Sequence, residues 1–130
     1  MTFLTTDPAV PRALRAWFVV HFVADWLFAV PLLLMPVAFG SLLGFTQTDP
    51  VTARLVGAAL VGIGTESLLC RNEGVERYRT MLRLKVLWSS TATVGLVVSA
   101  LQGAAPMTWG LAAIFAWFCG LWSFWSLRLR

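Results

Sequence analysis

The chain has 130 residues, of which 58% are hydrophobic and only 12% are charged. A soluble domain carries about 25% charged residues, because a small domain has a large surface that polar groups must cover. The composition therefore excludes a water-soluble globule, a disordered segment and a nucleic-acid-binding module, and the length predicts one domain, residues 1–130.

Four apolar stretches are long enough to cross the hydrocarbon core of a bilayer, which takes roughly 20 helical residues. We expect these spans at about residues 16–35, 51–70, 84–101 and 107–127. Together they use most of the chain and leave no room for a separate soluble domain. The sequence therefore predicts an all-α integral membrane protein, folded as a four-helix antiparallel bundle with short outer turns.

Prolines and a capping residue mark the limits of the first two spans. Pro31 is expected to kink the first span, and Pro36 to end it, because proline lacks the N–H that continues a helix. The apolar piece 37–45 is expected at the membrane interface. Asp49 before Pro50 is a typical helix start, since Asp is a favoured N-cap and Pro a favoured first helical residue.

Small residues recur on the second and fourth spans at helical spacing. On the second span, Gly62 lies on one face, whereas Gly57 and Gly64 lie nearly opposite. On the fourth span, Ala112 and Ala116 share a face. Small residues let helix backbones approach closely in lipid. We therefore expect these five residues to pack against other helices, with the second span central in the bundle or in contact with a second copy.

Five polar residues are predicted to converge in the cytoplasmic half of the spans. His21 and Asp25 are neighbours on one face of the first span, being four residues apart. Helix rise places His21 and Glu66 at roughly 8–10 Å depth and Asp25 near ~15 Å. Lys85 lies near the inner boundary, with Ser89 one turn above it. Helical phase and depth thus indicate one polar cluster.

Two interpretations of this cluster are open. A charged side chain at mid-membrane costs at least ~2.5–3.5 kcal/mol, so intramembrane ionisable groups often mark functional sites. In the functional interpretation, Asp25 and Glu66 are acceptors, His21 titrates near neutral pH, and Lys85 is the counter-charge. In the structural interpretation, Lys85 pairs with a carboxylate, His21 bonds to Asp25, and the cluster only holds the bundle together.

The cations predict the orientation of the chain. Only Arg54 falls on the outer side of the four spans. By the positive-inside rule, the basic loop and both termini are then cytoplasmic, in what we expect to be a prokaryotic plasma membrane. The net charge of +4 is explained by this orientation and by anionic lipid headgroups, without nucleic acid. The nine inner cations are Arg12, Arg15, Arg71, Arg77, Arg79, Arg83, Lys85, Arg128 and Arg130.

Motifs of known enzyme classes are missing from the sequence. It has no HExxH, no GxSxG and no His/Cys cluster with metal spacing. Gly62 and Gly64 do not begin a dinucleotide fingerprint, because Ser67 holds the third glycine position. We therefore expect a non-enzymatic protein without a metal or cofactor, whose partner is the lipid bilayer.

Two functions fit these expectations. In the first, the polar cluster binds or passes a proton, an ion or a small amphiphile. A chain of this length is too short for a transporter made of two repeated halves, so this function predicts a homo-oligomer. In the second, the chain is an accessory or scaffold subunit in a larger membrane complex. Its small-residue and aromatic faces then pack on another membrane protein, and the polar cluster is purely structural.

Overall fold

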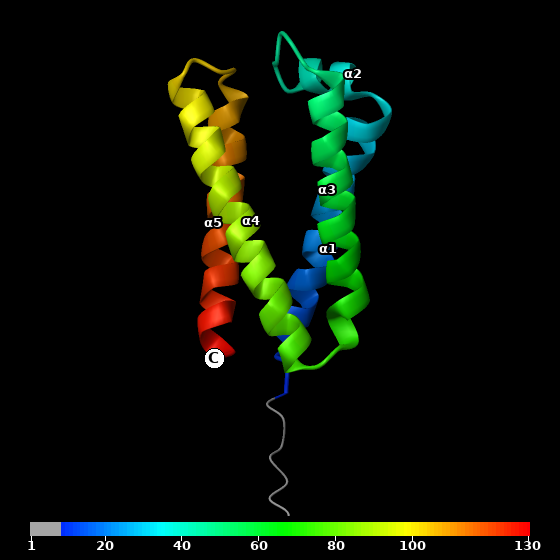
Figure 1. The fold of residues 1–130 in the computed structure, drawn as a ribbon, viewed down its shortest axis with the longest axis vertical. Helices are drawn as coiled ribbons and strands as arrows, with labels where there is room; N and C mark the ends of the chain where they lie inside the picture. Colours follow the sequence, from blue (N-terminus) through cyan, green and yellow to red (C-terminus); the bar gives the residue numbers. More distant parts are fainter. Residues whose placement is uncertain (1–8) are drawn as a thin grey trace, which may run out of the picture.

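The computed structural model describes residues 9–130, and this part of the chain is helical with no strands (Figure 1). Four of its helical segments are long and apolar enough to cross a membrane, as the sequence predicts. The elements are α1 (Arg12–Leu34), α2 (Pro36–Leu42), α3 (Pro50–Leu69), the 3₁₀ turn η1 (Cys70–Asn72), α4 (Val75–Leu101) and α5 (Met107–Arg128).

Two helices begin earlier than the hydropathy of the sequence predicts. α1 begins at Arg12 instead of about residue 16, and α4 begins at Val75 instead of about residue 84. Hydropathy marks where a helix can lie in hydrocarbon, and a helix can continue into the headgroup region. In α4, Glu76 lies in the first turn, where the helix dipole favours an anion, and it pairs with Arg79.

The start of α3 is capped as the sequence predicts. The Asp49 carboxylate accepts hydrogen bonds from the backbone N–H of Val51 at 3.3 Å and of Thr52 at 2.9 Å. Pro50 is the first helical residue. The side-chain and backbone hydrogen bonds from Thr52 hold the pKa of Asp49 below its usual value. These bonds satisfy N–H groups that have no partner within the helix.

The chain between the first two spans forms a second short helix. Pro31 lies inside α1, and Pro36 is the first residue of α2, so the break between the two helices falls at Met35. The outer cation Arg54 joins this region to α3, because its Nε donates to the backbone carbonyl of Leu33 at 3.1 Å. That bond satisfies one of the carbonyl groups left free at the end of α1.

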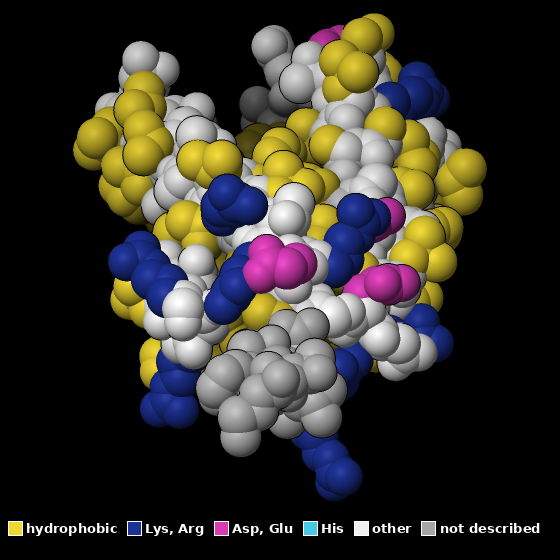
Figure 2. All heavy atoms as spheres, turned by 60° about the horizontal axis from the view of Figure 1, so that its bottom comes forward, with side chains coloured by type: hydrophobic (Ala, Val, Ile, Leu, Met, Phe, Trp, Pro, Cys, Tyr) yellow, Lys and Arg dark blue, Asp and Glu magenta, His cyan; other side chains and the backbone are white. Residues whose placement is uncertain are grey.

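The long helices associate in two pairs. α1 packs against α3, and α4 packs against α5. Successive long helices run in opposite directions, and the two pairs diverge from one end of the molecule (Figure 1). Lys and Arg side chains gather around that end, together with Asp and Glu (Figure 2). We call it the basic end.

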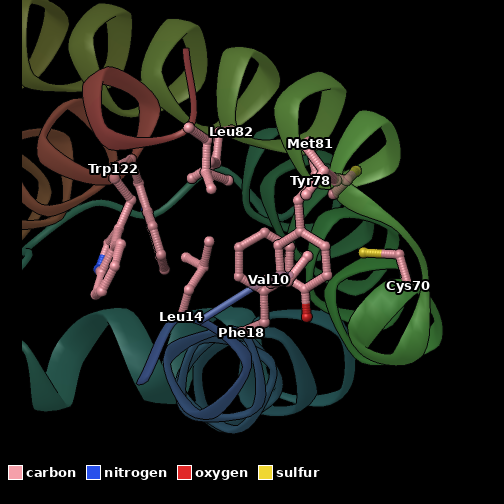
Figure 3. Close-up of a cluster of buried hydrophobic side chains, with 11 residues drawn as sticks. Val10, Leu14, Phe18, Cys70, Tyr78, Met81, Leu82 and Trp122 are labelled. Carbon is pink, nitrogen blue, oxygen red and sulfur yellow. The ribbon is translucent and has the colours of Figure 1, made fainter. Parts of the chain in front are cut away.

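A hydrophobic core joins the two pairs at the basic end (Figure 3). Within it, the rings of Phe18 and Tyr78 stack with their centroids 4.4 Å apart. The Tyr78 hydroxyl donates to the carbonyl of Arg71 at 2.7 Å, and Arg15 donates to the same oxygen. The core comprises Val10, Leu14, Phe18, Cys70, Val75, Tyr78, Met81, Leu82, Trp122, Trp125 and Leu129.

The small residues predicted to pack against helices differ in their surroundings. A Cβ atom on Gly57 would lie 3.0 Å from Leu33, and one on Gly64 would lie 2.8 Å from the Cβ of Asp25. These glycines therefore allow α1 and α3 to approach closely. Ala112 is buried. Gly62 and Ala116 are exposed and make no such packing within the described chain, because they lie on outward faces of their helices.

Candidate functional site

Lys85 is enclosed just above the hydrophobic core, with only 1% of its surface exposed. Its Nζ lies 2.8 Å from Nδ1 of His21 and donates to Oγ of Ser67 at 2.5 Å. The rings of Phe18 and Trp122 lie 4.9 Å and 4.8 Å from the same nitrogen. The ammonium group is therefore surrounded by an imidazole, a hydroxyl and two aromatic rings, which stabilise a cation away from water.

His21 lies between Lys85 and Asp25. The distance from its Nδ1 to Oδ2 of Asp25 is 3.1 Å. A ring nitrogen either accepts one hydrogen bond or donates one. When Nδ1 accepts from the Lys85 ammonium, it has no hydrogen to give to the carboxylate. Accordingly, Oδ2 of Asp25 is buried without a hydrogen-bond partner among residues 9–130.

The local sequence explains why these groups meet. His21 and Asp25 are one helical turn apart on α1. His21 contacts residues of α4 and α5, whereas Asp25 lies against Gly64 of α3. Gly64 leaves space on α3 for the Asp25 side chain. Ser67 lies one turn further along the same face of α3. The rings of Phe118 and Trp122 on α5 meet the His21 ring edge to face at 5.0 Å and 5.1 Å, which fixes its orientation.

Four of the five predicted cluster residues lie together, and Glu66 lies apart from them. Its side chain is 34% exposed and pairs with Arg77. The buried face of α3 holds Gly57, Gly64 and Ser67, so α3 is rotated relative to the expected phase. Ser67 therefore occupies the position expected for Glu66. Gly57 and Gly64 lie on one face of α3, and Ser67 follows Gly64 by three residues on the same face. This spacing is the sequence signal that points to Ser67.

Ser89 belongs to the buried polar group but does not bond to the side chains of its other members. Its hydroxyl donates to the carbonyl of Lys85 in the preceding turn at 2.7 Å. Such a bond satisfies the hydroxyl within its own helix. Ser89 therefore contributes a polar surface near Lys85 and does not hold the Lys85 side chain.

A cavity of about 700 Å³ lies between the two helix pairs, above this cluster. His21, Asp25 and Ser89 line it, whereas Lys85 does not. Its walls are mainly apolar, and polar residues near the start of α3, such as Gln47 and Thr52, also line it. Prominent apolar residues in the walls are Phe28, Leu32, Trp88, Leu96, Phe115 and Phe118.

The side chains of this site are donors and acceptors of hydrogen bonds. Within residues 9–130, no group of His, Cys, Asp and Glu is arranged to hold a metal ion. The site offers the cavity a carboxylate and an imidazole, with a lysine behind them. Comparison of the chain with protein-family models, with curated proteins and with solved structures finds no match.

Proposed function

We propose that the four long helices cross a prokaryotic plasma membrane as an antiparallel bundle, with both termini and the basic loop in the cytoplasm. The distribution of cations supports this orientation. Nine of the ten Lys and Arg residues belong to the segments at or near the basic end, and Arg54 is the exception. Cytoplasmic segments of membrane proteins carry such an excess of cations.

In this orientation, the protein binds a small amphiphile, with its apolar part in the cavity and its polar head at Asp25 and His21. One observation carries this proposal: an apolar cavity of about 700 Å³ has a buried polar cluster along one part of its wall. Mostly apolar walls with a few converging polar groups are typical of small-molecule sites. They suit a bare ion poorly, because its lost hydration needs several polar ligands. The proposed role is binding and not catalysis, with no metal or cofactor.

An accessory or scaffold role is the alternative, and exposed small residues on α5 favour it. Ala113, Ala116 and Gly120 are exposed and succeed one another at helical spacing. In lipid, such a face allows another helix to pack closely. Either a second copy of the chain or a different membrane protein fits this face, and in this role the polar cluster only stabilises the fold.

A binding measurement with a cavity-filling variant tests the amphiphile proposal. Radiolabelled dodecanol, dodecylamine and laurate are titrated onto the protein in lipid nanodiscs, with empty nanodiscs as background. We expect saturable binding of at least one probe. Ala92 lines the cavity, so Ala92→Phe should weaken that binding at least about tenfold, the effect of roughly 1.4 kcal/mol.

The matched control is Ala113→Phe, which adds the same ring on the exposed face of α5 outside the cavity. It should leave binding unchanged. Two results would overturn the proposal: no saturable binding of any probe, or equal binding by both variants. An assembly with another membrane protein, together with absent probe binding, would favour the accessory role.

A further inference from the structure

We propose that the head of the bound amphiphile is a neutral hydrogen-bond donor, an alcohol or a phenol, which Asp25 accepts at the cavity wall. This inference rests on the proposed function of the cavity. It follows from the contrast between Lys85, an enclosed cation that does not line the cavity, and Asp25, whose side chain does line it.

Lys85 has no free capacity for a ligand. Two of its N–H groups are directed at His21 and Ser67, and two aromatic rings cover the remaining space. It is not among the residues that line the cavity. An anionic head such as a carboxylate would therefore meet Asp25 without reaching the cation behind it.

Asp25, unlike Lys85, is placed to accept a hydrogen bond from a ligand. It lines the cavity, is only 7% exposed, and its Oδ2 has no hydrogen-bond partner among the described residues. An acceptor buried without a donor is costly, and more so when the acceptor is charged. A ligand that donates a hydrogen bond to the cavity-facing side of this carboxylate stabilises the same group and reduces that cost, which gives it an advantage over a ligand that only accepts.

The charge balance of the site then favours a neutral donor over a cationic one. With Lys85 protonated and Asp25 ionised, the site holds one buried cation and one buried anion, with His21 between them. An ammonium head would place a second cation beside one carboxylate in an apolar cavity, and an uncompensated buried charge is strongly unfavourable. A hydroxyl donates to Asp25 without changing the charge.

A series of heads on the same chain tests this inference. Dodecanol, dodecylamine, laurate and dodecane are compared for binding to the protein in nanodiscs. We expect dodecanol to bind most tightly, about tenfold or more above dodecane, as one hydrogen bond to a charged acceptor implies. Tighter binding of dodecylamine or laurate would overturn the inference while leaving the proposed function intact. Binding of none of the four would overturn both.

A variant that removes both buried charges tests whether Asp25 is the acceptor of the hydrogen bond. The double variant Asp25→Leu, Lys85→Met removes both buried charges together, and it should lose the tenfold preference for dodecanol over dodecane. The double variant Asp25→Asn, Lys85→Met also leaves no unpaired charge but retains a neutral acceptor oxygen, so it should keep part of that preference. An unchanged preference in the first double variant, when folded, would overturn the role of Asp25. If the first double variant does not fold, the order of affinity of the unaltered protein for the four probes still tests the inference.

Discussion

Lys85 occupies an apolar interior because its neighbours replace the water that an ammonium group would otherwise require. His21 and Ser67 take hydrogen bonds from its Nζ, and Phe18 and Trp122 present their rings. The negative charge that balances it is on Asp25, one imidazole away. Each partner therefore depends on the other, since either charge alone would be buried without compensation.

Removing one charge should cost far more than removing both. We expect Lys85→Met to lower the free energy of unfolding by roughly 3–5 kcal/mol, the usual cost of breaking a buried pair on one side. Adding Asp25→Asn should restore much of that loss. Detergent-induced unfolding followed by circular dichroism measures these changes. Arg83→Met is the control, because Arg83 is exposed on the same helix, and stability of Lys85→Met equal to this control would contradict the account.

The sequence predicts most of this cluster but not its member on α3. His21, Asp25, Lys85 and Ser89 follow from helical phase and depth, because each is a polar residue on a mostly apolar helix. The sequence predicts Glu66 as the member on α3, but Ser67 takes its place. Because α3 carries small residues on two faces, the sequence does not determine which of these faces turns toward α1. Contact with α1 fixes the rotation, and Arg77 from the next helix then pairs with Glu66.

At the scale of the elements, close packing between α1 and α3 positions the cluster. A side chain on Gly57 or Gly64 would collide with Leu33 or Asp25 of α1. Without an aqueous hydrophobic effect between helices in lipid, this close fit contributes much of their association. Hydropathy predicts the limits of α3 and α5 closely, but it misses the first turns of α4, where charged residues continue the helix beyond the apolar run.

Replacing Gly64 or Gly62 of α3 by alanine should have different effects on stability. In Gly64→Ala, the new Cβ would lie 2.8 Å from the Cβ of Asp25. We expect a loss of about 1–3 kcal/mol in the free energy of unfolding, typical of overpacking. In the control Gly62→Ala, the Cβ meets nothing within 4 Å, and removing a helical glycine should be neutral or stabilise by up to about 1 kcal/mol. The same unfolding assay compares them, and equal stability of the two variants would refute the observed rotation of α3.

At the scale of the whole molecule, two helix pairs meet at the basic end and diverge to leave a cavity. The hydrophobic core lies at the meeting point, so the cluster just above it is shielded from the aqueous phase at that end. The sequence predicts four spans in one bundle, but it cannot predict the cavity. The space depends on which helices pair, and four apolar helices of similar length offer several pairings.

The proposed orientation of the molecule predicts which loops face the outside of a cell. In a variant with both native cysteines replaced by alanine, a single cysteine is placed at Glu73 or at Gln102, which are exposed residues at opposite ends of α4. A membrane-impermeant maleimide should label the Gln102→Cys protein in intact cells and the Glu73→Cys protein only after lysis. The reverse pattern would place the basic end outside and contradict the orientation.

Where an amphiphile lies in the cavity is the sharpest test of the proposed function, because its polar end should meet Asp25 and His21. Two dodecanol probes carry a photoreactive diazirine, one beside the hydroxyl and one at the far end of the chain, and cross-links to the protein in nanodiscs are mapped by mass spectrometry. We predict that the first labels residues around Asp25 and Ser89, and that the second labels residues further from the cluster, such as Leu32 and Leu96, which line the same cavity. The same labelling pattern for both probes, or the reverse order, would contradict the account.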